Sequence, residues 1–224
     1  GWNPATDPAL PSPYRRGAMR GREECRARLE IELGLEPANG RPIFGMVTRM
    51  AAEKGVDLAL ACVGPLIQKG ARLVILGTGH PELEELAATL AGKHPRCFVF
   101  RREHNEGLAR RIFAGSDFFL MPSASEPCGL TQMYAMRYGA IPVVGDTGGL
   151  HDTVEEWDAT GQRGTGFLFH PHTESALRGA LDRALALWDE PAIMGVARQN
   201  GMKKEWGWGS AVPAYEKVYR SVLA

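Results

Sequence analysis

Two basic side chains follow the first strongly apolar run of this 224-residue sequence, PIFGMV, and could bind an anionic ligand. Arg49 and Lys54 lie five residues apart within residues 48–55 (TRMAAEKG). An arginine can hold two oxygens of a diphosphate through paired N–H donors, and a lysine adds a compact point charge. The pair therefore indicates a diphosphate site, although two solvated surface charges would produce the same pattern.

A second stretch, residues 123–131 (SASEPCGLT), lies between the apolar run DFFLM and a predicted helix. The free N–H groups at a helix N-terminus bind anions, so we expect a phosphate beside Gly129, Leu130 and Thr131, where the threonine hydroxyl adds a donor. Glu126 would be repelled by that phosphate and suits the hydroxyls of a sugar. A helix cap with an exposed glutamate is the alternative interpretation.

Two further loops contain glycines that allow the backbone to approach a ligand closely. Gly77, Thr78 and Gly79 follow the apolar run RLVIL, and residues 145–150 (GDTGGL) follow a later one. The first loop is a short G-x-G without the full dinucleotide-binding pattern, so a tight turn explains it equally well. The second loop can likewise be a plain connection.

The sequence lacks the residue patterns of several classes of enzyme and metal site. The sequence contains no Asp-x-Asp pair to hold a divalent metal on a diphosphate, so we expect chemistry without metal or cofactor, in which Arg49, Lys54 and backbone amides meet the negative charge. It has no G-x-S-x-G and no P-loop lysine motif, which argues against a hydrolase and a P-loop ATPase. Its four cysteines form no C-x-x-C pair, so we expect reduced thiols rather than zinc ligands or disulfides.

Charge and hydrophobicity also limit the partners. Lys plus Arg and Asp plus Glu each number 26, so no nucleic acid or anionic membrane is expected. No apolar run reaches the roughly 18 residues of a membrane helix, and the first residues lack the pattern of a signal peptide. We expect a cytoplasmic protein, with plastid import through a removed transit peptide as the alternative.

Short apolar strands alternate with helices along most of the chain. Strands without strict alternation are typical of a sheet covered on both faces, and helical crossovers between them imply a parallel, doubly wound Rossmann-like sheet. Ligands of such sheets bind at the carboxyl ends of the strands, where the loops above lie. Strands are predicted at residues 42–48, 72–77, 97–101, 117–121, 140–144 and 166–169, and helices at 20–33, 56–68, 81–91, 106–115, 130–138, 173–188, 191–204 and 210–222.

Proline and glycine mark the boundaries. Four prolines within residues 1–16 exclude a helix there and indicate a linker, which leaves residues 17–224 as one domain with closing C-terminal helices. Gly34 is expected to end the first helix. Gly64 and Pro65 are expected to disturb the second.

Residues 126–139 (EPCGLTQMYAMRYG) and 147–150 (TGGL) resemble the signature of bacterial glycogen synthases and plant starch synthases. Residues 48–58 (TRMAAEKGVDL) resemble the R-x4-KG loop of that family, and 2–11 (WNPATDPALP) its interdomain linker. Residues 207–221 resemble its C-terminal helix. The similarity covers essentially the whole chain, and EPCGLTQ is its most specific part.

The resemblance implies the C-terminal half of a GT-B fold, in which two Rossmann-like domains face each other across a cleft. The N-terminal domain, with its K-x-G-G-L loop and glucan-facing surface, would then be the missing partner. The TGGL of this chain has Asp146 rather than lysine two residues before Gly148, and belongs to the C-terminal domain.

The family pattern assigns roles residue by residue. Arg49 and Lys54 match cations that stabilise the leaving diphosphate, and Glu126 matches the carboxylate that contacts the donor glucose. Cys128 and residues 129–131 match the stretch that meets sugar and phosphate. His104 stands where the family usually has a tyrosine stacked on adenine; an imidazole can also stack.

The implied reaction moves glucose from ADP-glucose or UDP-glucose to the non-reducing end of an α-1,4-glucan with retention of configuration. Another retaining GT-B transferase and a non-catalytic nucleotide- or glucan-binding module are the alternatives. Broader retaining transferases, such as sucrose synthases, have E-x7-E in the loop that begins at Glu126. Tyr134 occupies the position of the second glutamate and favours the glucan synthases.

Overall fold

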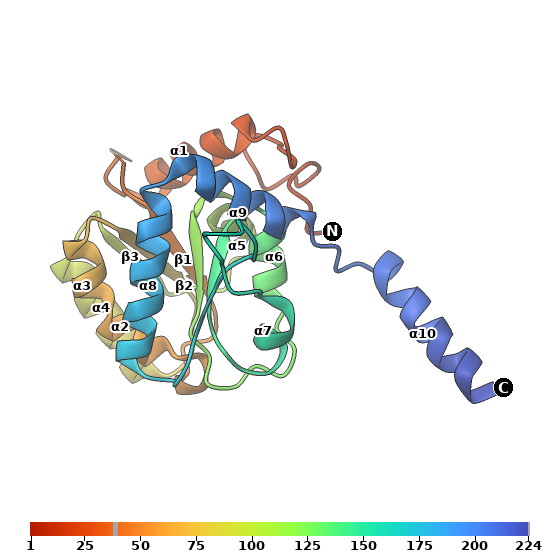
Figure 1. The fold of residues 1–224 in the computed structure, drawn as a ribbon. Coiled ribbons are helices and arrows are strands. Elements are labelled where there is room, and N and C mark those ends of the chain that lie inside the picture. Colours follow the sequence, from red (N-terminus) through yellow and green to blue (C-terminus); the bar gives the residue numbers. More distant parts are fainter. Residues whose placement is uncertain (38–39, 224) are drawn as a thin grey trace.

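The computed structural model describes residues 1–37 and 40–223 (Figure 1). Its centre is a six-stranded parallel sheet in the order β3-β2-β1-β4-β5-β6, which confirms the predicted doubly wound fold. Neighbouring strands pair in register, with Met46 opposite Ile75 and Gly45 opposite Phe119. The strands are β1 (Ile43–Val47), β2 (Arg72–Leu76), β3 (Phe98–Arg101), β4 (Phe118–Met121), β5 (Ile141–Gly145) and β6 (Phe167–Phe169).

Helices cover both faces of this sheet (Figure 1). Each central strand sends alternate apolar side chains to opposite faces, as Phe118 and Phe119 of β4 do, and this explains why the strands are apolar throughout. The helices are α1 (Arg20–Leu33), α2 (Val56–Ala61), α3 (Val63–Gln68), α4 (Pro81–Lys93), α5 (Glu106–Gly115), α6 (Thr131–Arg137), α7 (Gly148–Thr153), α8 (Glu174–Trp188), α9 (Pro191–Lys203) and α10 (Trp208–Leu223), with a short 3-10 helix, η1 (Ala52–Lys54).

Most element boundaries agree with the expectations to within a residue or two. Gly34 ends α1 in the left-handed conformation, at φ 66°, as expected of a glycine stop. The predicted helix 56–68 divides at Cys62 into α2 and α3, so Pro65 falls in the first turn of α3, where its missing N–H leaves no helical bond unmade. The sequence analysis did not predict α7, which begins at Gly148 within the GDTGGL loop.

Residues 1–19 contain no helix or strand and run across α1, α5 and α6 as an arm. Its side chains do not simply point to solvent, because Asp7, Leu10 and Tyr14 are buried. The hydroxyl of Tyr14 donates to the carbonyl of Tyr138 at 2.8 Å, next to α6. The segment interpreted as a linker is therefore packed onto the domain, while its role as a connection between domains stays a prediction.

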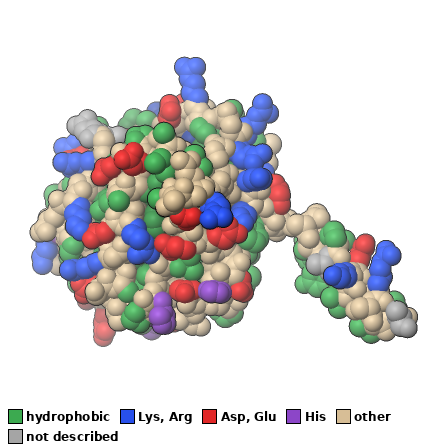
Figure 2. All heavy atoms as spheres, in the orientation of Figure 1, with side chains coloured by type: hydrophobic (Ala, Val, Ile, Leu, Met, Phe, Trp, Pro, Cys, Tyr) green, Lys and Arg blue, Asp and Glu red, His purple; other side chains and the backbone are tan. Residues whose placement is uncertain are grey.

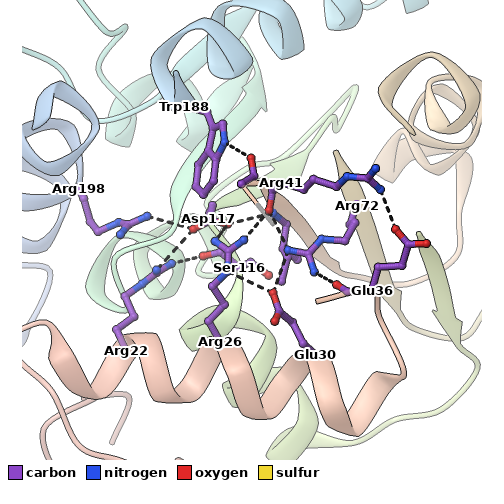
Figure 3. Close-up of polar contacts among 12 residues, drawn as sticks. Arg22, Arg26, Glu30, Glu36, Arg41, Arg72, Ser116, Asp117, Trp188 and Arg198 are labelled. Atoms are coloured by element: carbon purple, nitrogen blue, oxygen red, sulfur yellow. Dashed lines mark hydrogen bonds and ion pairs between the residues drawn. The ribbon is translucent and has the colours of Figure 1, made fainter. Parts of the chain in front are cut away.

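A cluster of buried charges lies at the amino ends of β1, β2 and β4, opposite the edge that carries the loops of interest (Figure 3). Asp117 is 2% exposed and is surrounded by the guanidinium groups of Arg22, Arg26 and Arg198. Its carboxylate also accepts the backbone N–H of Ile43 at 3.0 Å. Burial lowers the pKa of Arg198 to about 9, and the neighbouring Arg22 adds to the effect while Asp117 opposes it.

Helix α10 projects from the body of the molecule (Figure 1). Trp208, Val212, Tyr215, Tyr219 and Val222 recur at helical spacing and are all exposed, and Figure 2 shows hydrophobic side chains along this helix. This amphipathic face has no covering element among the described residues. Within the same residues, no helix combines the length and the apolar character needed to cross a membrane.

Candidate functional site

The candidate residues come from four loops at the carboxyl edge of the sheet, following β1 to β4. The strand order reverses between β1 and β4, and open parallel sheets bind ligands at such a switch point. A smaller cavity, of about 340 Å³, lies there between the β1 and β4 loops. A larger one, of about 370 Å³, extends over the β2 and β3 loops toward α5 and α6. The two share Val47, Thr48 and Thr131 in their walls, so they adjoin.

The smaller cavity is built around an ion pair between Lys54 and Glu126. Lys54 Nζ lies 2.7 Å from Glu126 Oε2, and the two side chains are only 19% and 12% exposed. Ser123 adds a weaker contact from its hydroxyl to the same carboxylate oxygen, at 3.4 Å. The fold thus brings together a cation and a carboxylate that are 72 residues apart in the chain, and each orients the other.

The β4 loop is held in place by Gln132, which is fully buried on α6. Its side-chain nitrogen lies within 3.2 Å of the carbonyls of Cys128 and Gly129 and of the Thr153 hydroxyl. From the other side, the amide N–H of Gly149 donates to the carbonyl of Glu126 at 2.8 Å. The EPCGLTQ motif is therefore a braced loop that fixes the position of the glutamate.

Glycine is required at one contact of this brace. A Cβ atom on Gly149 would lie 1.9 Å from the carbonyl oxygen of Cys128, so any side chain there must push the two segments apart. The backbone of the GDTGGL loop does make a close approach, and the segment that it approaches is the β4 loop of the same chain. A further ligand is not needed to explain these glycines.

Arg49 and Lys54 do not share one environment. Arg49 lines the larger cavity, its side chain is 70% exposed, and it pairs with Glu53 at 2.9 Å. The pKa of Glu53 lies below its ordinary value because its own backbone N–H bonds the carboxylate and Arg49 stands beside it. The surface-charge interpretation thus describes Arg49 as it stands, whereas Lys54 is built into the site.

The residues of the Gly77–Thr78–Gly79 turn have two different environments, a cavity wall and a backbone contact. Gly77 and Thr78 line the larger cavity together with His104. Gly79 does not; its N–H donates to Glu84 at 2.7 Å, and a Cβ there would meet the Met50 carbonyl at 2.3 Å. The turn explanation therefore accounts for Gly79.

Residues 128–131 likewise have different environments. Gly129, Leu130 and Thr131 line the smaller cavity, while Cys128 is exposed and lies outside both walls. The Thr131 hydroxyl lies 3.0 Å from the sulfur of Met121, a weak acceptor that an arriving anion can easily replace. Leu130 caps α6 without a side-chain hydrogen bond.

Sequence reasoning missed the aromatic side of the larger cavity. Trp2, Phe113 and Tyr134 line it together, from the arm, α5 and α6. In the sequence, Tyr134 stands out only as the replacement of a glutamate, and Trp2 only as part of a linker. Their aromatic character was the available signal, but nothing local to either residue indicates that they meet.

The two cavities together suit an elongated ligand with chemically different ends. The larger one offers flat apolar surfaces and an imidazole to a ring system. At the junction Thr131, Arg49 and Lys54 can bind an anion, and Glu126 can accept hydrogen bonds from hydroxyl groups beyond it. No group of three or more metal-binding side chains occurs among residues 1–37 and 40–223.

The family model "Glycosyl transferases group 1" matches residues 30–200 of this chain. Curated glycogen synthases from Opitutus terrae and Anaeromyxobacter dehalogenans are 43% and 44% identical to it over 222 residues. Each alignment covers 99% of this chain and 46% of the relative. The chain therefore spans about half the length of the curated relatives that it matches.

A solved structure shows the same similarity. The catalytic domain of starch synthase IV from Arabidopsis thaliana, bound to ADP and acarbose, superimposes with a TM-score of 0.90 at 36% identity. That similarity covers all of this chain and 47% of the chain in that structure.

Proposed function

Because this chain belongs to the glycosyl transferases group 1 family, we propose that it forms the donor-binding C-terminal half of a glycogen or starch synthase. The whole enzyme would transfer glucose from a nucleotide sugar to the non-reducing end of an α-1,4-glucan. The observation that carries this proposal is the Lys54–Glu126 pair at the switch point, directly beside a partly aromatic cavity.

In the proposed complex the nucleoside occupies the larger cavity, with its base against His104. The diphosphate lies at the junction near Thr131, within reach of Arg49 and Lys54, and the glucose lies over Glu126. ADP-glucose is the favoured donor, because the similar starch synthase structure was solved with ADP bound; UDP-glucose is the alternative.

The proposed chemistry follows from where charge develops. The bond between glucose C1 and the diphosphate oxygen breaks, while the acceptor 4-hydroxyl attacks C1 from the same face. The departing phosphate takes the hydroxyl proton, so the products are the nucleoside diphosphate and a glucan one residue longer. Lys54 stabilises the charge that grows on the leaving group, and Glu126 orients the sugar through its hydroxyls.

The leaving group needs no metal in this proposal, because cationic side chains already stand at the junction. Calorimetric titration of ADP into the chain, with and without a chelator, tests this directly. Affinity within a factor of two in both conditions is expected. A tenfold loss on chelation would require a metal on the diphosphate.

We further propose a cytoplasmic location, supported by four cysteines that are all free thiols. Microscopy of the tagged full-length protein tests it.

The decisive experiment compares the full-length protein with the 224-residue chain. Labelled ADP-glucose and UDP-glucose are supplied separately with glycogen, and incorporation into polymer is measured. We expect incorporation by the full-length protein, faster with ADP-glucose, and none by the chain alone, because half of the cleft is absent. Transfer to a different acceptor would favour another retaining transferase, and ADP binding without any transfer by the full-length protein would favour a binding module.

A further inference from the structure

The wall of the larger cavity includes one residue that does not belong to the Rossmann-like domain. Trp2 lies in the arm, yet it lines the cavity beside Phe113 and Tyr134. The other lining residues come from the ends of β1 and β2, the loops after β1 to β3, and helices α5 and α6. The arm therefore supplies part of the proposed nucleotide site.

Trp2 is held between two groups. Its ring stacks on Tyr134, with centroids 4.3 Å apart and planes 11° from parallel, and the Arg110 guanidinium carbon lies 4.0 Å from the ring centroid. Both separations are close to van der Waals contact, so the two groups cover opposite faces of the indole. Phe113 and Tyr138 meet it edge-on. The indole can thus offer only an edge to the cavity.

The group that covers Trp2 also anchors the arm. Arg110 Nη1 lies 3.0 Å from the carboxylate of Asp7, a buried residue of the arm, and the Tyr138 hydroxyl donates to the same carboxylate. The Ala9 N–H donates to Asp7 as well, at 2.9 Å. Arg110 itself does not line the cavity. Docking of the arm and placement of Trp2 therefore depend on the same side chain.

We propose that Trp2 is a positioning residue of the nucleotide site, kept in place by Arg110, and that arm docking and nucleotide binding favour each other. The inference rests on the proposed function, since it takes the larger cavity as the place of the nucleoside. By linkage, any change that displaces the arm weakens nucleotide binding. Bound nucleotide in turn stabilises the docked arm by the same free energy. In the proposed two-domain enzyme the arm connects the halves, so their relative movement would reach the donor site through Trp2.

The test is ADP affinity, measured by calorimetry on the full 224-residue chain. Trp2→Ala and Arg110→Gln should each lower the affinity for ADP about three- to tenfold, the range expected from losing one aromatic contact. Trp2→Phe should restore most of the affinity. Trp206→Ala is the matched control, because Trp206 is 40% exposed and lies between α9 and α10, away from the cavity.

A double variant separates positioning from a general loss of structure. If Arg110 acts through Trp2, Arg110→Gln should have no further effect on ADP affinity in the Trp2→Ala background. ADP should also slow hydrogen exchange of the Ala9 amide in the wild-type chain but not in Trp2→Ala. Additive effects of the two substitutions, or undiminished protection of Ala9 in Trp2→Ala, would overturn the inference.

The two proposals fail in different ways. If wild-type chain binds no ADP at all, the proposed function fails. If wild-type binds ADP and Trp2→Ala binds it equally well, only the role of Trp2 is wrong. Should Trp2→Ala melt too low for calorimetry, Trp2→Phe, Arg110→Gln and the exchange of Ala9 in wild-type decide the question.

Discussion

At the scale of single residues, the two cations differ in how ready they are for the ligand. Lys54 is largely buried and already oriented by Glu126, whereas Arg49 is mostly exposed and bound to Glu53. A diphosphate must draw Arg49 away from a surface partner, an interaction of low free energy. Lys54 already lines the smaller cavity, where its partner Glu126 keeps it oriented.

Replacing either cation by alanine in the full-length protein should lower kcat far more than it raises KM for the donor. Negative charge on the leaving phosphate grows as the glycosidic bond breaks, so a cation there favours the transition state. The loss should be on the order of 100- to 1,000-fold, as for single oxyanion donors. Arg49→Lys should recover part of it, because a point charge cannot reproduce a two-pronged contact.

Steady-state kinetics with ADP-glucose and glycogen measure this effect. Lys69→Ala is the control, because Lys69 forms an exposed ion pair with Asp182 away from both cavities. A kcat within threefold of wild type in Arg49→Ala or Lys54→Ala would mean that the residue concerned does not bind the diphosphate.

At the scale of elements, the loops of the site are positioned by backbone contacts that leave no room for a side chain. Gly149, the second residue of α7, lies against the carbonyl of Cys128, and Gly77 passes the carbonyl of Thr48 after β2. Such contacts hold the carboxyl ends of the strands close together. They hold the loops of the candidate site in place without any contribution from Lys54 or Glu126.

Gly149→Ala should destabilise the chain by roughly 2 kcal/mol or more, because its Cβ would overlap the Cys128 carbonyl. The β4 loop carries Glu126, so donor affinity should fall as well. Gly179→Ala in α8 is the matched control: nothing lies within 4 Å of its Cβ, and alanine should add up to about 1 kcal/mol of helix stability. Chemical denaturation of both variants gives the comparison, and equal stabilities would contradict the packing argument.

The opposite edge of the sheet depends on Asp117 in a similar way. Asp117→Asn would leave Arg22, Arg26 and Arg198 buried without their shared carboxylate, which should cost about 3–5 kcal/mol. Asp158→Asn removes an exposed pair with Arg163 and should cost at most about 1 kcal/mol. Urea denaturation distinguishes them; a loss below 1 kcal/mol for Asp117→Asn would show that the cluster is not held by this carboxylate.

At the scale of the whole molecule, α10 shows that the described chain leaves one surface uncovered. Its stripe of Trp208, Tyr215 and Tyr219 is 57–76% exposed, and the helix stands apart from the body (Figure 1). An exposed apolar stripe of this kind marks a contact surface. This chain spans about half the length of its curated relatives, and we expect the other half of the full-length protein to cover this stripe.

Deleting residues 204–224 should leave the melting temperature of the isolated chain within about 3 °C of wild type, because α10 contributes little packing to the body. The same deletion in the full-length protein should lower both its melting temperature and its transferase activity. Differential scanning calorimetry and glucose incorporation measure the two effects. Strong destabilisation of the isolated chain would show that α10 packs on this domain instead.

The sequence by itself determined most of the strands and helices, and it indicated the loops that we propose carry the chemistry. Apolar runs such as PIFGMV fit only strands covered on both faces, and the alternation with helices leaves a parallel sheet as the simple solution. Gly34 ends α1 for a reason visible in one residue type. These are local properties, because periodicity and turn chemistry act over a few residues.

Only the tertiary structure decided which distant residues meet. Strand order places the β1 loop beside the β4 loop, and that brings Lys54 to Glu126. Packing of the arm on α5 and α6 brings Trp2 to Tyr134, which is 132 residues further along. Arg49 and Lys54 look equivalent in the sequence, yet Arg49 is a surface residue and Lys54 belongs to a partly buried ion pair. Burial and pairing depend on the neighbours that folding supplies, and no local pattern encodes them.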